Sequence, residues 1–345
     1  MSAVYKIGLV GSGFGLKAHL PAIAAHPQLE CVALASPRSA PAAVAERGIP
    51  NAFASAEELL ASGVPLDGIV VASPPFAHRD AVLDALARGV HVLCEKPFAL
   101  NVADAEAMLA ASLASDAVAG VVHEFRWVPE RTAIKELVTN GHLQPLREIE
   151  ITQLLGMLRG DGRRARGWWF ERGKGGGMAG ALLSHVIDSA NWIAGRPPIR
   201  TTGMLRTANP SRTDAAGTFA IDVDDGAFAL LDYGDGLIGR LTVDGTARVS
   251  QFTLAVHAEN RTAVASGTGM QDMRLFSVDE EETNELDCKP SPYARFAAVH
   301  DHVPLLMELY DAWIAKIETG TSPLLPTFAE AVETQRVLAA IGYST

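Results

Sequence analysis

The sequence predicts an α/β protein with a doubly wound parallel sheet in an N-terminal domain and a large, open, mainly antiparallel sheet in a second domain. Two patterns carry this prediction. Up to Val122, short continuous apolar runs alternate with Ala-rich helical stretches, which is typical of a parallel sheet covered on both faces. From Arg147 onward, polar and apolar residues alternate over long segments separated by turn residues, which indicates antiparallel strands. A length of 345 residues also exceeds one ordinary core.

The first strand, Ile7 to Val10, ends directly in a glycine-rich loop. Gly11, Gly13 and Gly15 follow the strand, and a helical pattern runs from Leu16 to Ala25. This order is how an α/β sheet builds a phosphate site, because glycines let phosphate oxygens approach the backbone. The helix N-terminus then offers free N–H groups and a partial positive charge.

The loop departs from the dinucleotide fingerprint G-x-G-x-x-G at its third glycine. Leu16 occupies that position, and a glycine falls one place earlier. Because Gly-rich strand ends also occur as plain turns, the motif alone leaves both interpretations open. Its place between a strand and a helix favours a cofactor site, for which we predict the contacts Gly11, Gly13, Phe14, Gly15 and Leu16.

The second strand, 30–36, ends in a segment that bears on the choice of cofactor. NAD-binding domains usually carry an Asp or Glu there, which accepts hydrogen bonds from the ribose hydroxyls. Here the chain reads Ser36-Pro37-Arg38, without a carboxylate. Ser36 can donate a hydrogen bond and Arg38 can pair with a phosphate, so we predict NADP in preference to NAD. The alternative is that Arg38 is simply a solvent-facing turn residue.

The remaining strands of this sheet are expected at 67–72, 90–94 and 118–122, between helical stretches at 39–47, 56–61, 78–88 and 102–115. Ligands bind such a sheet at the carboxyl ends of its strands. We therefore predict further cofactor contacts at Ser73, Pro74, Pro75, His78, Glu95 and Lys96. Two alternatives stay open: the prolines could merely start a helix, and an isolated Glu-Lys-Pro is more often part of a salt bridge.

The chain changes character after Glu124. A helix is expected over 129–140, and strands at 147–155, 217–233, 237–243, 249–258 and 263–265. Helical patterns return at 293–316 and 322–341. We expect a dinucleotide-binding domain at 1–124 and a second domain at 125–321. Residues 322–345 should form a C-terminal helix that packs back on the first domain.

A second stretch with chemical character runs from Arg166 to Asp188. It contains a triple glycine, which suits a flexible or closely approached loop, and then a helix. On that helix Ala181, Ser184, His185 and Asp188 follow at spacings of three and four, so they can share one face. His185 could exchange a proton near neutral pH. The alternative is a buried histidine that donates to a carbonyl or pairs with Asp188.

Composition excludes several classes of protein. The formal net charge of −11 disfavours a nucleic-acid partner. Three cysteines, far apart and without a C-x-x-C pair, indicate neither a disulfide framework nor a zinc site, and we expect no metal. No apolar run is long enough to span a bilayer, and the N-terminus does not resemble a signal peptide. These features predict a cytoplasmic protein without a membrane partner.

Together these motifs resemble the glucose–fructose oxidoreductase and inositol dehydrogenase family, often called Gfo/Idh/MocA. The resemblance covers essentially the whole chain. It rests on six features in the right order: Gly11-x-Gly13 with His19, Pro75-x-x-His78, Glu95-Lys96-Pro97, Phe125-Arg126-x-x-Pro129, Gly175-Gly-Gly177 with His185 and Asp188, and the helix from Pro326 to Ile341.

The resemblance implies an N-terminal Rossmann domain, a C-terminal α/β domain with an open sheet, and a homodimer or homotetramer formed through that sheet. It also implies an NAD(P)-dependent oxidoreductase of sugars, cyclitols or related hydroxyl compounds. Lys96 would contact the substrate hydroxyl and His185 would be the acid/base. Arg126, Arg166 and Trp168 would line the substrate pocket, although Trp168 could equally be a packing residue.

The sequence departs from the family pattern at two positions. Leu16 replaces the third glycine, and Ala181 stands where the family usually has an Asp one helical turn before the histidine. The loss of that Asp favours an alternative, a sensor or regulator that binds dinucleotide and sugar without turnover. A third reading is an oxidoreductase of a non-sugar substrate such as a dihydrodiol, a tetrapyrrole or an aldehyde.

Overall fold

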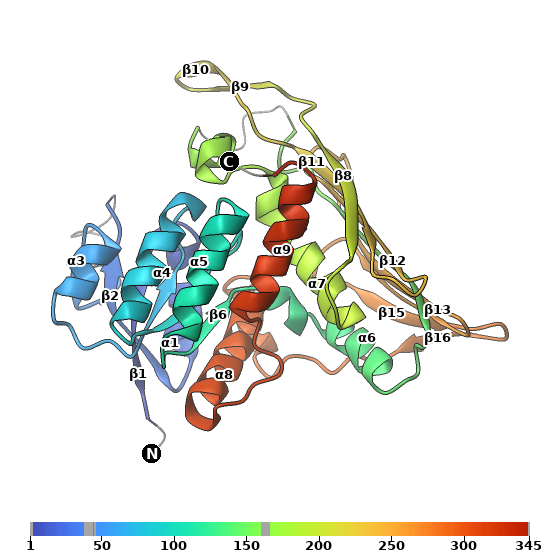
Figure 1. Cartoon of the computed structure of the whole chain (residues 1–345), viewed down its shortest axis with the longest axis horizontal. Coiled ribbons are helices and arrows are strands. Elements are labelled where there is room, and N and C mark those ends of the chain that lie inside the picture. Colours follow the sequence, from blue (N-terminus) through green and yellow to red (C-terminus); the bar gives the residue numbers. More distant parts are fainter. Residues whose placement is uncertain (1–2, 38–43, 45, 160–165, 344–345) are drawn as a thin grey trace. The chain divides into compact units, whose positions relative to one another are not determined.

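The protein consists of two compact units, shown in Figure 1. The computed structural model describes residues 3–37, 44, 46–159 and 166–343. The first unit is Met1–Glu124 with Ser291–Val332, and the second is Phe125–Pro290 with Glu333–Thr345. The expected division kept 291–321 in the second domain and assigned 322–345 to the first. The structure groups 291–321 with the first unit because the helix in that segment packs against the first helix of that unit.

The first unit contains the predicted doubly wound parallel sheet. Its six strands have the order β3-β2-β1-β4-β5-β6, and every neighbouring pair is parallel. The strands are β1 (Tyr5–Val10), β2 (Leu29–Ala35), β3 (Asn51–Phe53), β4 (Gly68–Val71), β5 (His91–Cys94) and β6 (Ala119–Val121). Sequence patterns missed β3, because its three residues are all only partly buried and form no apolar run.

Helices cover both faces of this sheet. They are α1 (Leu20–Ala25), α3 (Ala56–Ala61), α4 (His78–Ala87), α5 (Val102–Leu113) and α8 (Val303–Thr319). Side chains of α3, α4 and α5 share one buried cluster with Val10 and Val71 of the strands. On the other face, Trp313 of α8 fills the space above Gly68, where an added Cβ would lie 2.4 Å from its ring. Polar caps fix the start of two helices: the side chains of Ser55 and Asn101 accept from backbone N–H groups of α3 and α5.

The second unit is built on an eight-stranded sheet with the order β16-β15-β14-β13-β7-β12-β11-β8. Only β7 and β12 are parallel neighbours, so the sheet is mainly antiparallel, as predicted. The strands are β7 (Leu146–Leu154), β8 (Arg200–Arg206), β11 (Gly226–Asp232), β12 (Ile238–Asp244), β13 (Gln251–Ala258), β14 (Thr262–Gly267), β15 (Arg274–Val278) and β16 (Thr283–Leu286). The helices α6 (Pro129–Thr139) and α7 (Ser184–Ala194) contact this sheet (Figure 1).

One predicted strand, 217–233, is two strands in the structure. Its first part, β10 (Gly217–Ala220), pairs with β9 (Ser211–Asp214) in a separate hairpin, and its second part is β11. The acidic segment around Asp222, Asp224 and Asp225 interrupts the alternation between them. Arg212 connects the hairpin to the segment before it, because its guanidinium donates a hydrogen bond to the carbonyl of Leu158.

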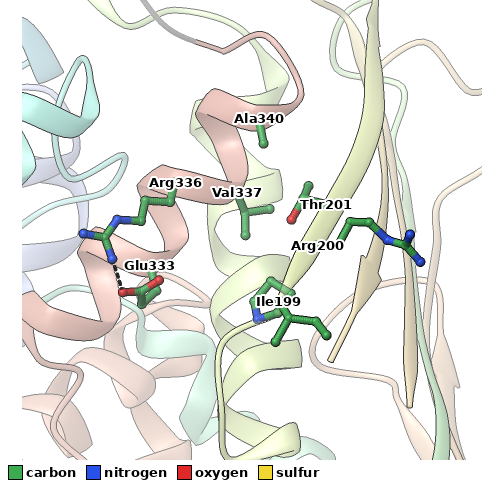
Figure 2. Close-up of a pocket in the computed structure, with 8 residues that line it drawn as sticks. Ile199, Arg200, Thr201, Glu333, Arg336, Val337 and Ala340 are labelled. Atoms are coloured by element: carbon green, nitrogen blue, oxygen red, sulfur yellow. Dashed lines mark hydrogen bonds and ion pairs between the residues drawn. The ribbon is translucent and has the colours of Figure 1, made fainter. Parts of the chain in front are cut away.

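The last helix, α9 (Phe328–Ala340), crosses the boundary between the units along the chain. Phe328 packs on Phe98 with ring centroids 4.6 Å apart and belongs to the buried cluster of the first unit. Later residues of α9 and the start of β8 line a pocket of about 170 Å³ in the second unit. Figure 2 shows Val337 facing β8, while the guanidinium groups of Arg336 and Arg200 point away on opposite sides. The pocket contains none of the predicted site residues.

Candidate cofactor and catalytic residues

The glycine loop of the first unit has the geometry that a phosphate site needs. Gly11 has a φ of 105°, and an added Cβ would lie 2.4 Å from the carbonyl oxygen of Ala72, so only glycine fits where β1 passes the end of β4. Around Gly13 no atom lies within 4 Å of an added Cβ. A ligand can therefore approach the backbone at Gly13.

Gly15 performs the packing role that the fingerprint assigns to its third glycine. An added Cβ at Gly15 would lie 3.3 Å from the side chain of Leu9 on β1, so the helix rests closely on the strand at this residue. The helix begins with a π-helical turn, Gly15–His19, before α1. Leu16, at the fingerprint position, is only partly buried. The shifted glycine thus preserves the close packing of helix and strand.

The end of β2 lies beside the glycine loop. Ser36 is buried, and its hydroxyl donates to the hydroxyl of Ser12 over 2.9 Å. The loop between β1 and α1 and the end of β2 are therefore connected by side chains as well as by the sheet. Arg38, the predicted phosphate partner, lies outside the described residues.

Beyond β4, His78 connects two loops at the carboxyl edge of the sheet. Its Nε2 lies 2.8 Å from the carbonyl of Ser73, and its Nδ1 lies 3.2 Å from that of Phe98. Burial lowers the pKa of His78, although the two carbonyls oppose the shift. A neutral imidazole donates a hydrogen bond from one nitrogen only. The shorter of the two contacts indicates that this donor is Nε2. Pro75 is the first residue of the 3-10 turn before α4, and Pro74 precedes it. Pro75 therefore does start a helical segment.

Glu95 and Lys96 follow β5 at the same edge. Glu95 is buried, and its carboxylate accepts from the Nε2 of His19 at 2.9 Å and from the backbone N–H of Lys96 at 3.1 Å. Burial favours the neutral carboxyl, but the hydrogen bond from His19 and the charge of Lys96 outweigh it, so the pKa of Glu95 is lowered. Lys96 itself is partly exposed.

A cluster of aromatic and histidine rings surrounds Phe14, which sequence reasoning did not foresee. The ring centroids of His302, His19 and His300 lie 5.3, 5.5 and 5.9 Å from that of Phe14, all edge to face. His302 also contacts the buried carboxylate of Glu124 at 2.7 Å. These residues come from segments at opposite ends of the chain, so no local pattern could have joined them.

In the second unit, the triple glycine is a closely packed loop rather than a loose one. An added Cβ at Gly176 would lie 2.4 Å from the carbonyl of Trp169, and one at Gly177 would lie 2.4 Å from a carboxylate oxygen of Asp224. The hydroxyl of Tyr343 donates to the carbonyl of Gly175 at 2.9 Å. Of the two alternatives left open by the sequence, the structure shows the closely approached loop.

Asp224 holds the beginning of the helix that carries His185, and sequence analysis missed it. Its carboxylate accepts from the backbone N–H of Ala179 at 2.7 Å, where a π-helical turn (Ala179–Leu183) leads into α7. Burial raises the pKa of Asp224 to about 6, against the opposing hydrogen bonds. The sequence shows Asp224 only as one member of an acidic loop, which usually indicates a solvated segment.

His185 lies in α7 and is 1% exposed. Its imidazole stacks on the ring of Phe125, with centroids 4.0 Å apart and an angle of 11° between the planes.

Asp188, one turn further along α7, forms a buried ion pair with Arg126. Its two oxygens accept from the Nε and a terminal nitrogen of Arg126 at 2.9 and 2.7 Å, and both side chains are 2% exposed. Arg126, predicted to bind substrate, therefore uses its guanidinium to hold Asp188. This paired geometry lets Arg126 support α7, and its contact with substrate stays a prediction.

Arg166 and Trp168 are more exposed than this buried ion pair. Arg166 is exposed, and its guanidinium sits 4.8 Å from the ring centroid of Phe219 in the β9–β10 hairpin. Trp168 is partly exposed at the start of a short 3-10 turn, whereas the next two aromatic residues are buried. Trp168 is thus the residue of this aromatic run with surface to offer a ligand.

Metal-binding groups and membrane-spanning helices are the last two features that bear on function. Within the described ranges, no group of three or more His, Cys, Asp or Glu side chains is arranged to hold a metal ion. In the same part of the chain, no helix combines the length and apolar character needed to cross a membrane.

Comparisons with known proteins agree with the architecture. Residues 5–123 match the "Oxidoreductase family, NAD-binding Rossmann fold", and residues 132–264 match the "GFO/IDH/MocA C-terminal domain". The rhizopine catabolism protein MocA of Rhizobium meliloti is 30% identical over 250 residues, which cover 69% of this chain and 71% of that protein. Levoglucosan dehydrogenase of Pseudarthrobacter phenanthrenivorans is 25% identical over 80% of this chain and 77% of that protein.

A further relative, an uncharacterized oxidoreductase of Synechocystis sp., is 34% identical over 210 residues, which are 60% of this chain, and the match spans 56% of its own length. Among solved structures, levoglucosan dehydrogenase in complex with NADH has a TM-score of 0.84 at 21% identity, over 98% of this chain and 95% of that one. An oxidoreductase domain protein from Kribbella flavida has a TM-score of 0.86 at 24% identity, over 99% and 96%. The predicted fold class is confirmed, and the chain belongs to the Gfo/Idh/MocA family of oxidoreductases.

Proposed function

We propose that this protein is an NAD(P)-dependent dehydrogenase or reductase that acts on a CH–OH group of a sugar, cyclitol or related hydroxyl compound, with a preference for NADP. Relatives are named for such reactions: levoglucosan dehydrogenase, 1,5-anhydro-D-fructose reductase and D-apiose dehydrogenase. One structural neighbour is described in complex with NADH and levoglucosan. These names suggest the substrate class for this chain, and its own residues suggest the roles.

The glycine loop is the observation that carries the cofactor proposal. Gly11 makes the turn, Gly13 leaves the backbone open, and the helix after Gly15 presents its N-terminus, which suits a dinucleotide diphosphate. Bound there, the nicotinamide would supply the hydride acceptor or donor. Ser36 supports the NADP preference. Its hydroxyl lies beside the glycine loop at the end of β2, where the sequence has no carboxylate.

Lys96 and His185 would handle the substrate oxygen and its proton. In the oxidative direction, His185 would accept the proton of the carbinol hydroxyl, directly or through water, and Lys96 would stabilise the charge that develops on oxygen. Phe14, Ser73 and Glu95 would contribute to the cofactor surroundings, and Trp168 and Arg166 would contact substrate. The support is local: Lys96 follows β5 at the ligand edge, and His185 is held in a defined ring orientation.

Parallel fluorescence titrations with NADPH and NADH test the cofactor proposal. NADPH should bind more tightly, and a screen of sugars and cyclitols with NADP should then reveal turnover. Tighter NADH binding would overturn the Ser36 argument and leave the fold unchanged. Binding of neither dinucleotide would remove the glycine loop as a cofactor site.

Two substitutions test the chemical roles. Lys96→Met and His185→Ala should each lower turnover by about a hundredfold or more while the protein still binds dinucleotide. The competing function is a sensor that binds dinucleotide and sugar without turnover, which Ala181 favours because the usual Asp is absent. Near-normal rates in both variants would reject the catalytic roles, and binding of sugar without any turnover would establish the sensor.

A further inference from the structure

The imidazole of His185 is oriented by a ring lying on its face. Phe125 is 4% exposed, and the small angle of 11° between its plane and that of His185 makes the contact a parallel stack. Such a stack resists rotation of the imidazole about its Cβ–Cγ bond, because rotation would drive the ring edge into Phe125. It does so without using either ring nitrogen.

This mode of support differs in its chemistry from support by a carboxylate. Imidazole donates and accepts hydrogen bonds in the plane of the ring, so a carboxylate partner takes one nitrogen and favours the protonated form. A stacked phenyl ring contacts only the π face. Ala181 stands at the position where a carboxylate would follow from the family pattern. The stack on the face of His185 is thus one contact through which this chain orients the imidazole.

Phe125 is itself contacted by a residue of α6 that also bonds to α7, the helix that carries His185. The guanidinium of Arg131 lies 5.1 Å from the centroid of the Phe125 ring and donates to the hydroxyl of Ser189. That hydroxyl in turn donates to the backbone carbonyl of His185 at 2.8 Å. The same network therefore fixes the stacked ring and the backbone from which His185 projects.

We infer that Phe125 is a positioning residue for His185, which orients its imidazole for proton exchange by stacking, where the family pattern has a carboxylate and this chain has Ala181. This inference rests on the proposed catalytic role of His185. Phe125 does not need to touch the substrate, so its removal should affect the turnover step more than substrate or cofactor binding. A misplacement of a reacting group by about 1 Å can cost roughly a hundredfold in rate.

The experiment compares Phe125→Leu and Phe125→Tyr with a matched control, Phe252→Leu, which removes another buried phenyl ring from the second unit. On a substrate found with the wild-type enzyme, Phe125→Leu should lower kcat between tenfold and a hundredfold with KM for the dinucleotide unchanged, as about 10²-fold is the range for misplaced groups. Phe125→Tyr keeps the stacked ring and should restore most of kcat. Phe252→Leu should keep kcat.

A double-mutant cycle and NMR separate this inference from the proposed function. In a His185→Ala background, Phe125→Leu should cause no further loss of kcat. The ring protons of His185 should show an upfield ring-current shift that disappears in Phe125→Leu, and Phe125→Met gives the same comparison if the leucine variant does not fold. A full loss in His185→Ala with unchanged kcat in Phe125→Leu would overturn the positioning role alone. Unchanged turnover in His185→Ala would instead overturn the proposed function, and with it the need for positioning.

Discussion

Glu95 accepts a hydrogen bond from the Nε2 of His19 at 2.9 Å, while the Nδ1 of the same ring lies 2.7 Å from the hydroxyl of Tyr310. Burial raises the pKa of Tyr310 well above its usual value, so the phenol keeps its proton and can donate to Nδ1. The lowered pKa of Glu95 keeps its carboxylate ionised as the acceptor. The Nε2 of His19 therefore carries the proton of the hydrogen bond to Glu95. Tyr310, His19 and Glu95 form a buried hydrogen-bonded chain that ends next to Lys96.

Replacing Glu95 by Gln should make folding less sensitive to acid. A carboxyl whose pKa is lowered by folding contributes stability above its ordinary value of 4.5, and this contribution is lost as pH falls through the folded value. The difference in unfolding free energy between wild type and Glu95→Gln, measured by urea titration, should therefore shrink as pH falls from 7 to 3. Tyr310→Phe, which removes one neutral hydrogen bond, should cost about 1 kcal/mol at both pH values. An equal pH dependence in wild type and Glu95→Gln would contradict the His19 pairing.

Two alanine substitutions in the glycine loop should have opposite effects. Gly11→Ala forces a Cβ against the backbone of Ala72 at a positive φ, so it should destabilise the fold by more than about 1 kcal/mol. Gly13→Ala meets open space and should change stability by less than about 0.5 kcal/mol. It should nevertheless weaken dinucleotide binding, because the new methyl group occupies the approach to the backbone. Melting curves and fluorescence titrations of the two variants check this, and intact affinity in Gly13→Ala would argue against the diphosphate position.

Asp224 should make stability decline as pH rises. Its carboxyl has a pKa of about 6 in the folded protein, raised by burial from an ordinary value of 3.8, so the folded state binds the proton more tightly. The proton therefore stabilises the fold fully below pH 3.8, and this contribution is lost as pH rises to about 6. Because the shift is about two units, the loss is roughly 1–3 kcal/mol. Asp224→Asn keeps an acceptor for the N–H of Ala179 and should not show this decline in urea titrations at pH 5 and pH 8.

Asp224→Ala provides the comparison for the helix contact. It removes the acceptor altogether, and the loss of a helix N-terminal partner costs about 0.5–2 kcal/mol. Stability below wild type at pH 5 for Asp224→Ala, but not for Asp224→Asn, would be the expected pattern. Identical behaviour of the two variants would show that the contact with Ala179 contributes nothing.

The exposed face of the large sheet should mediate self-association. Met204 of β8 is 63% exposed, and Leu230 of the neighbouring strand β11 is 52% exposed. Phe228, two residues before Leu230, pairs with Met204 across the two strands. Contiguous exposed apolar side chains favour a partner surface. We propose a homodimer or homotetramer through this face, and the double variant Met204→Glu, Leu230→Glu should have a lower mass by light scattering. Val4→Glu, at an equally exposed apolar residue of the first unit, should keep the wild-type mass.

Local chemistry made much of the first unit predictable. A strand that breaks into Gly11 and Gly13, and a strand that ends in Glu95-Lys96, mark the ligand edge by sequence order alone. The sequence shows that Gly15 stands one place before the third fingerprint glycine. Its close packing on Leu9 is a property of the folded chain that the sequence does not reveal. The roles of Lys96 and His185 stay predictions, since the experiments above decide them.

Contacts between distant residues could not be predicted in the same way. The stack of Phe125 on His185 and the hydrogen bond between His19 and Tyr310 join segments with no shared local pattern. Asp224 stands in an acidic loop whose composition suggests solvent, whereas packing against Gly177 buries it. The π-helical turn before α7 also has no signal in the spacing of the sequence.

The discontinuity of the first unit constrains when that unit can fold. Its sheet is finished by Val121, yet Trp313 fills the space above Gly68 and Leu325 packs on Gly120. A nascent chain that has emerged only to Glu124 lacks these side chains, so an apolar face of its sheet remains open to water or to other chains. These contacts join residues that are far apart in the sequence. The first unit can therefore finish folding only after the second sheet has been synthesised. The glycine loop is thus translated before the second sheet, yet the unit to which it belongs is completed only after that sheet.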